Sequence, residues 1–181
     1  MFKKTLIAAA LAVAATGSFA QVYVQGTIGQ GTVNAQYVGI GATDTKKSTT
    51  GNKLIVGYEL GNQWSIEANM IDYGKSSTNV TAFPAAEFKI SGYGIGGAYT
   101  FNNASKWNFR IGLGINNNKA TTIVTNVSTS ESSTQANLDI GVGYKITDTF
   151  TAIAAIDSSA AKYSGKNYSA SLLSIGIRAK F

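Results

Sequence analysis

Apolar and polar residues alternate with a period of two along most of the chain between Val22 and Phe181. Eight stretches show this alternation, with apolar side chains at one parity and small or polar side chains at the other. A strand with lipid on one side and a narrow lumen on the other has this pattern, and its sheet must close because hydrocarbon tolerates no unpaired edge. The pattern therefore predicts an all-β fold, an eight-stranded antiparallel up-and-down transmembrane β-barrel.

The outward apolar positions locate each expected strand. The first strand begins at Val22, and its alternation breaks near Gly29 and Gly31; the others cover residues 54–60, 64–70, 93–101, 107–115, 136–146, 150–156 and 173–181. Three connections are then short, at 61–63, 102–106 and 147–149, and four are long, at 30–52, 74–86, 117–133 and 158–168. Because outer-membrane barrels have short periplasmic turns and long external loops, this alternation also orients the barrel.

Aromatic residues bracket each of the three short connections. Aromatic side chains favour the boundary between lipid and water, so these residues are predicted to form a belt at the periplasmic interface. The belt comprises Tyr58, Trp64, Phe101, Trp107, Tyr144 and Phe150.

The N-terminal segment has the pattern of a secretory signal peptide. Lys3 and Lys4 precede an apolar run at 6–15, and Ser18-Phe19-Ala20 supplies a small-residue cleavage site. The apolar run is too short to be a transmembrane anchor, which needs about 20 residues. We expect cleavage after Ala20, so that residues 1–20 are removed and residues 21–181 form the barrel domain.

Composition restricts the chemistry that the chain can perform. The sequence has 20 Gly, one Pro, no Cys, no His and a formal net charge of +6. Without His or Cys, serine triads and thiolate catalysis are excluded in their usual forms. We therefore expect no enzymatic activity and no cofactor, although rarer carboxylate or lysine mechanisms stay open. The mild positive charge gives no case for nucleic-acid binding.

Charged residues at the inward parity are candidates for a site in the lumen. Glu67 lies three residues after Trp64 and Arg110 three residues after Trp107, both on rising strands, so the two are expected to pair across the lumen. Leaving charges unpaired in a narrow interior would be costly. The network is either a structural plug or a gate with exchanging partners, and an eight-stranded barrel is only just wide enough to be filled by side chains. The ion-pair or gate candidates near the periplasmic end are Glu59, Glu67, Arg110, Lys145, Arg178 and Lys180.

Asp139 and Asp157 form a second candidate lumen site. A hairpin centred on Asp148 places the two carboxylates directly opposite each other on the inner face. Adjacent carboxylates attract a cation. Two ligands without His make a poor metal site, so we expect an inward lysine and no metal ion.

The glycines between Gly92 and Gly97 match the G-x-G-x-x-G pattern of nucleotide-binding loops. That pattern requires a helix after the glycines, whereas these glycines lie within an expected strand. They are better explained as a source of space in the lumen, with Gly94 and Gly96 expected opposite Gly114 and Gly112.

The chain resembles the small outer-membrane β-barrel proteins, both the OmpA-like transmembrane domain and the OmpX-like proteins. The resemblance rests on the hairpins at Trp64 and Trp107, the glycine-rich strand at 93–101 and the terminal Phe181. The resemblance covers residues 21–181. It implies a monomer in the outer membrane of a Gram-negative bacterium, exported through the signal peptide. It also implies that the barrel assembly machinery reads the C-terminal pattern of Ile177, Ala179 and Phe181. The chain is expected to end with the barrel and to lack the soluble domain of the two-domain members.

The external loops are the remaining candidate surface. Their basic residues suit phosphorylated lipopolysaccharide and outer-membrane lipid, and the candidates are Lys46, Lys47, Lys119, Lys162 and Lys166. The β-prone segment Thr121–Val127 either extends the sheet or forms a protruding hairpin whose edge pairs with a partner strand, as in OmpX-like proteins. The sequence thus favours a structural or surface-interaction role, adhesin-like or in envelope integrity, with a host or surface ligand. The alternative is a narrow gated, porin-like channel for ions or small solutes.

Overall fold

The computed structural model describes residues 22–34, 44–46, 48–61, 63–80, 83–124 and 127–181. The predicted signal peptide and Lys47 lie outside these residues. No helix in the described part of the chain is long and apolar enough to cross a membrane.

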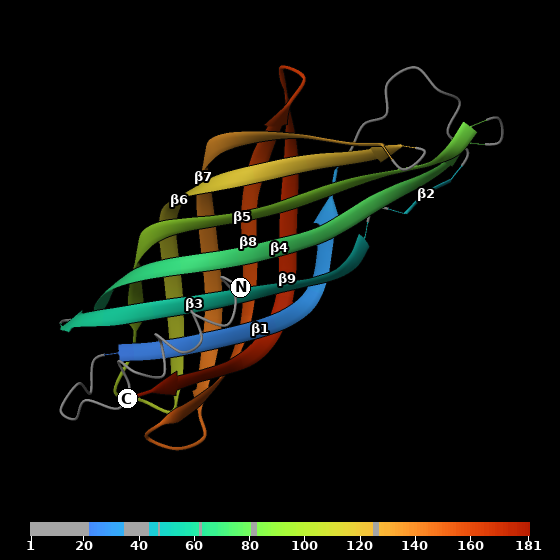
Figure 1. Ribbon diagram of the computed structural model, residues 1–181. Coiled ribbons are helices and arrows are strands. Elements are labelled where there is room, and N and C mark those ends of the chain that lie inside the picture. Colours follow the sequence, from blue (N-terminus) through green and yellow to red (C-terminus); the bar gives the residue numbers. More distant parts are fainter. Residues whose placement is uncertain (1–21, 35–43, 47, 62, 81–82, 125–126) are drawn as a thin grey trace.

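The described residues form nine strands, shown in Figure 1. Eight long strands pair antiparallel with their neighbours, and the pairing of the first with the last, from Tyr23↔Lys180 to Val33↔Ala170, closes the sheet. The eight-stranded barrel predicted from the sequence is therefore confirmed. The ninth strand, β2, is short and pairs with β4 outside the barrel. The strands are β1 (Val22–Val33), β2 (Asp44–Lys46), β3 (Ser48–Gly61), β4 (Trp64–Val80), β5 (Phe83–Phe101), β6 (Trp107–Val124), β7 (Val127–Lys145), β8 (Phe150–Tyr163) and β9 (Lys166–Lys180).

The two faces of the wall follow the predicted parity. Large apolar side chains such as Leu113 and Ile175 point outward and are 66% and 68% exposed, while Arg110 on the neighbouring inward parity is 5% exposed. All six predicted belt aromatics are exposed, as a lipid-facing belt requires. Two of them are in contact, because the rings of Trp107 and Tyr144 have centroids 4.8 Å apart and are tilted by 57°.

The external ends of the strands differ from the prediction. The loops expected at 74–86, 117–133 and 158–168 are largely strand, because β4 to β9 all continue past the apolar band. Beyond the membrane neither face has to be apolar, so the period-two signal fades although the backbone ladder continues. The protruding hairpin at 121–127 is present, with β6 and β7 paired up to Val124↔Val127. Four lysines assigned to loops lie on strands instead: Lys46 on β2, Lys119 on β6, Lys162 on β8 and Lys166 on β9.

The connection between β8 and β9 is a two-residue turn. Ser164 and Gly165 both have positive φ, 49° and 75°, as the central residues of a type I′ turn require. Tyr163 pairs with Lys166 directly across it. The dipeptide Ser164-Gly165 between two strand segments is itself a turn signal, and the long loop expected at 158–168 is wrong.

Two register details also correct the sequence analysis. The hydrogen-bonded ladder of β1 continues through Gly29 and Gly31 without a break. What changes there is the character of the inward side chains, because the inward residue Val33 is apolar and belongs to a buried apolar cluster. In the β5–β6 hairpin, Gly96 faces Gly114 as two glycines, but Gly94 faces Asn116. Asn102 starts this turn with a φ of 54°, so the hairpin pairs Phe101 with Phe109.

We expect Gly57→Ala to lower the free energy of unfolding by about 1–3 kcal/mol through overpacking. Gly57 pairs with Tyr23, and a Cβ at position 57 would meet the Tyr23 ring. Urea unfolding of refolded protein in micelles measures the effect. Gly26→Ala is the matched control, because nothing lies within 4 Å of its added Cβ. Equal unfolding midpoints for the two variants would contradict this packing.

Candidate functional site

A lysine lies between the two facing aspartates of the lumen. Asp139 pairs with Asp157 across the β7–β8 ladder, as the sequence predicts. Lys53 of β3 reaches them from the opposite wall: its Nζ donates to Asp139 Oδ2 at 2.9 Å and also to Asp157 Oδ1. The expected inward lysine is thus present, and the sequence analysis did not name it. Its position at the inward parity of β3, in step with Ile55 and Glu59, was the available signal.

Arg110 of β6 connects this group to Glu67 of β4. Its two terminal nitrogens contact Glu67 Oε2 and Asp139 Oδ1, so one guanidinium bridges two carboxylates. The hydroxyl of Tyr23 donates to the other oxygen of Glu67. Ser65 Oγ lies 3.1 Å from the same Tyr23 oxygen, within hydrogen-bonding distance.

These contacts form one continuous chain, which we call the lumen network. Each of its six members comes from a different strand, and none is more than 8% exposed. Removing water from unpaired charges is costly, so a closed chain of partners is what stabilises this interior. In order, the members are Tyr23 (β1), Glu67 (β4), Arg110 (β6), Asp139 (β7), Lys53 (β3) and Asp157 (β8).

The remaining predicted lumen charges surround the periplasmic mouth. Lys180 forms an ion pair with Glu59 at 2.5 Å. Lys145 instead donates to the backbone carbonyl of Asn103. Arg178 has no carboxylate within ion-pairing distance in the described part of the chain. Six of the eight predicted residues therefore form ion pairs, while Lys145 and Arg178 have other partners.

Arg178 has two other partners, both on β1. Its Nε and Nη2 donate to Gln25 Oε1 at 3.1 and 2.8 Å. Its guanidinium also lies over the Tyr23 ring, 4.5 Å from the centroid, in a cation–π arrangement.

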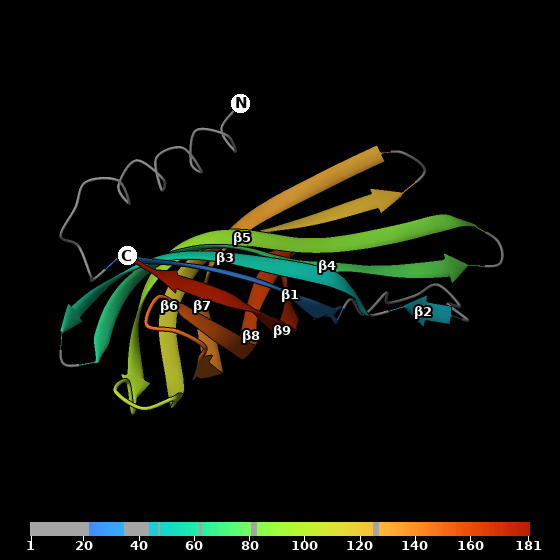
Figure 2. The same cartoon turned by 90° about the horizontal axis from the view of Figure 1, so that it is seen from below.

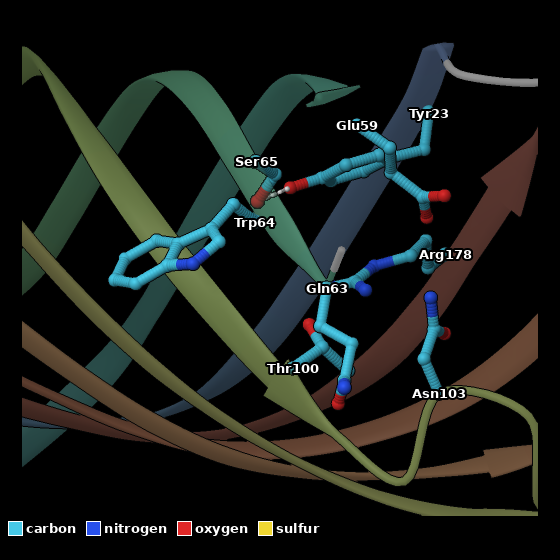
Figure 3. A pocket seen from close by; sticks show the side chains of 8 residues that line it. All are labelled: Tyr23, Glu59, Gln63, Trp64, Ser65, Thr100, Asn103 and Arg178. Atoms are coloured by element: carbon cyan, nitrogen blue, oxygen red, sulfur yellow. Dashed lines mark hydrogen bonds between the residues drawn. The ribbon is translucent and has the colours of Figure 1, made fainter. Parts of the chain in front are cut away.

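A cavity of about 90 Å³ opens beside Arg178 at the periplasmic mouth (Figure 3). We call it the mouth pocket. A second, smaller cavity of about 10 Å³ lies beside Arg110, Glu67 and Lys53 and has room for about one water. The mouth pocket is lined by Tyr23, Glu59, Gln63, Trp64, Ser65, Thr100, Asn103 and Arg178.

The external half of the lumen is apolar, which the sequence analysis did not predict. Above the lumen network, paired amides such as Asn69 and Asn116 span the interior. Beyond them lies a buried cluster, the external hydrophobic cluster, in which the Phe88 ring contacts Tyr163 and Tyr168 at centroid distances of 5.7 and 4.9 Å. The cluster contains Val33, Ile71, Tyr73, Phe88, Ile90, Ala120, Ala161, Ala170 and Leu172, with Tyr163 and Tyr168 packed against it.

The predicted external and C-terminal residues lie apart from the lumen. Lys119, Lys162 and Lys166 are exposed on three different strands, and Lys46 belongs to β2. Outward Ile177 and Ala179 lie on β9, and Ile177 is 54% exposed. Phe181 follows β9, and its backbone N–H donates to the Val22 carbonyl at 2.8 Å. The C-terminal pattern therefore lies at the β1–β9 seam.

A closed sheet with an exposed aliphatic band, an aromatic belt and a filled interior defines a transmembrane β-barrel. Residues 5–181 match the family described as the outer membrane protein beta-barrel domain. The chain belongs to this family and is an outer-membrane β-barrel protein. No match is found among curated proteins.

Several solved structures share the fold at low sequence identity. Neisserial surface protein A (NspA) aligns with a TM-score of 0.67 and 18% identity, covering 88% of this chain and 97% of that one. OprG of Pseudomonas aeruginosa aligns with a TM-score of 0.56 and 16% identity, covering 91% and 98%. Ail, the attachment invasion locus protein of Yersinia pestis, aligns with a TM-score of 0.54 and 18% identity, covering 87% and 99%. At these identities the likeness extends to the fold alone.

Proposed function

We propose that this chain is a surface-interaction barrel of the Gram-negative cell envelope, adhesin-like and without enzymatic activity. The observation that carries the proposal is a sheet that continues beyond the barrel. On the external side β2, β4, β5, β6 and β7 form one ladder, through the pairs Thr45↔Thr78, Thr78↔Ala86, Ala86↔Val124 and Val124↔Val127. Figure 2 shows the β4–β5 and β6–β7 hairpins reaching away from the barrel.

The outer edge of this sheet is a strand that a partner can extend. β7 pairs with β8 only as far as Asn137↔Ser159, so residues 127–136 of β7 have a ladder partner on the β6 side alone among the described residues. Three side-chain hydrogen bonds join part of this edge to the β8–β9 hairpin, from Lys162 N to Ser133 Oγ, from Ser164 N to Glu131 Oε2 and from Ser159 Oγ to the Ala136 carbonyl. Residues 127–130 are exposed and contain no Lys or Pro, the usual protection of an edge strand. Strand addition is an established mode of recognition at such an edge.

The external lysines suggest a second, electrostatic contribution to binding. Lys162 and Lys166 flank the β8–β9 turn and are exposed, so they suit anionic ligands such as lipopolysaccharide phosphates. One solved structure of Ail holds the heparin analogue sucrose octasulfate. By analogy of fold, polysulfated host glycans are a further ligand class for this surface. The exported protein would act as a monomer after removal of residues 1–20 and insertion by the barrel assembly machinery.

The lumen supports a structural role more than a channel. Six strands are cross-linked by the lumen network, and the external hydrophobic cluster fills the interior above it. The second candidate, a narrow gated channel, is favoured by the small cavity that Glu67 and Arg110 line and by the mouth pocket at the periplasmic end.

We expect that trimming the β6–β7 hairpin abolishes adhesion and leaves the barrel intact. Replacing residues 121–130 by Asn-Gly joins Ala120 to Glu131, which face each other in the ladder, through a two-residue turn. Adhesion of bacteria displaying either protein to cultured epithelial cells is the measurement. Heat-modifiable electrophoretic mobility verifies that the trimmed barrel has folded.

The control variant Lys162→Gln/Lys166→Gln removes charge and keeps the sheet. It is expected to reduce binding of sucrose octasulfate and to retain hairpin-dependent adhesion. Undiminished adhesion by the trimmed protein would rule out the protruding sheet as the interaction surface.

A further inference from the structure

We propose that the mouth pocket is a binding site for a small oxyanion, a phosphate or carboxylate group that enters from the periplasmic side. This site lies at the opposite end of the barrel from the external sheet and does not depend on the surface role. Four observations carry it: an incompletely satisfied guanidinium, a set of amides facing it, the charge of the rim and the size of the pocket.

Arg178 supplies the charge. A guanidinium has five N–H donors, and the two hydrogen bonds to Gln25 leave others available. Tyr23 fixes the plane of the group by lying against its face. Among the described residues no carboxylate lies within 4 Å of Arg178, so an anion from outside would be its direct ionic partner.

The opposite wall of the pocket carries two amides. Figure 3 shows the Arg178 side chain reaching between Tyr23 and Glu59 on one side and Gln63 and Asn103 on the other. Side-chain amides donate through their NH₂ groups, so guanidinium and amides together can surround an oxyanion. Gln63 adopts a φ of 73°, which places it in the tight β3–β4 turn at the pocket rim.

The charge of the rim favours an anion over a cation. Glu59 also lines the pocket, but Lys180 neutralises it at 2.5 Å. Lys145 binds the carbonyl of Asn103, so a second ammonium group lies next to a pocket residue. An isolated carboxylate would repel an anion, whereas this one is paired with Lys180 and leaves Arg178 without a carboxylate in direct contact.

The size of the pocket limits the ligand. A volume of about 90 Å³ has room for roughly six or more water molecules, which is enough for a phosphate or carboxylate head. It is far below the roughly 300–1,000 Å³ that is typical of pockets for drug-sized ligands. Trp64 belongs to both the pocket and the aromatic belt. The oxyanion can therefore arrive free in solution or as the headgroup of an inner-leaflet phospholipid.

The two sources are distinguished by nuclear magnetic resonance of the refolded protein in nanodiscs. One arm titrates sodium phosphate at constant ionic strength into nanodiscs of phosphatidylcholine. The other arm replaces part of the phosphatidylcholine by phosphatidylglycerol without added phosphate. The Nε–H resonance of Arg178 and the indole N–H resonance of Trp64 report binding. A saturable shift of both is expected in at least one arm, and the arm that shows it identifies the source.

The variant Arg178→Gln should weaken the Trp64 response about tenfold or more, since it removes a charged hydrogen-bond partner. Lys106→Gln is the matched control, because it removes one positive charge from an exposed turn residue at the same end, outside the pocket. Arg178→Lys, which keeps the charge and loses the planar fork, should bind at intermediate strength and serves if Arg178→Gln does not fold. No saturable shift in either arm, or equal affinity in the Arg178 and Lys106 variants, would overturn the proposal.

Discussion

Lys53→Met is expected to lower the free energy of unfolding by about 3–5 kcal/mol, the usual cost of removing one partner from a buried ion pair. Lys53 is 5% exposed and contacts both Asp139 and Asp157. Met has a similar length and no charge, so packing is nearly conserved while two facing carboxylates lose their shared cation. Arg110 still neutralises Asp139, which leaves Asp157 as the unpaired charge.

Urea unfolding of the refolded protein in lipid vesicles measures this loss. Adding Asp157→Asn to Lys53→Met is expected to restore much of the stability. The second change removes the carboxylate charge that the first change leaves without a partner. Lys119→Met serves as the surface control, since Lys119 is exposed on β6. A Lys53 variant as stable as the Lys119 variant would show that the lumen network does not stabilise the barrel.

The wild-type protein is expected to leave a planar lipid bilayer without conductance, and Glu67→Ala is expected to do the same. The lumen has two barriers in series, and the substitution alters only the lumen network. The external hydrophobic cluster above it excludes ions because an apolar interior cannot solvate them. Phe88→Ala alone should be silent for the complementary reason, since the ion pairs of Arg110 persist.

Only the double variant Arg110→Ala/Phe88→Ala is expected to conduct. It removes the guanidinium beside the 10 Å³ cavity and the Phe88 ring that contacts both Tyr163 and Tyr168 in the external hydrophobic cluster. Single-channel recording distinguishes this series arrangement from a gate. Openings of the wild-type protein that disappear or change in Glu67→Ala would support the gated channel and contradict the two-barrier lumen.

Lipid contact explains why the membrane-spanning part of the fold was predictable from the sequence. Residues such as Ile95 and Ile175 must face hydrocarbon, so their alternation with small or polar residues fixes both strand and face. The same logic located the aromatic belt and the facing pair Asp139 and Asp157, since a symmetric turn sets that register.

Beyond the membrane the same reasoning fails. Residues 127–136 of β7 are almost all small or polar and are not buried on either face, so their composition resembles a loop. Strand pairing there depends on the neighbouring strand and not on an apolar face. The inner face also departs from the expected pattern, because the inward residues Val33 and Phe88 are apolar where small or polar side chains are expected.

The partners of the lumen network were only partly predictable because they come from strands that are not neighbours. Glu67 and Arg110 were matched by their equal distance from two belt tryptophans. Lys53 has no such marker, and its contact with Asp139 crosses the whole lumen between β3 and β7. The side-chain reach across a barrel depends on tilt and stagger, which one strand does not encode.

The charge balance of the lumen bears on its response to an electric field. The buried ions Lys53, Arg110, Glu67, Asp139 and Asp157 sum to −1, and Arg178 just below them brings the total to zero. A transmembrane potential exerts about 2.3 kcal/mol per elementary charge for each 100 mV, so a neutral interior experiences no net force. The side chains of the lumen network, together with Arg178, should therefore keep their positions when a voltage is applied. The Donnan potential of the envelope would not displace them.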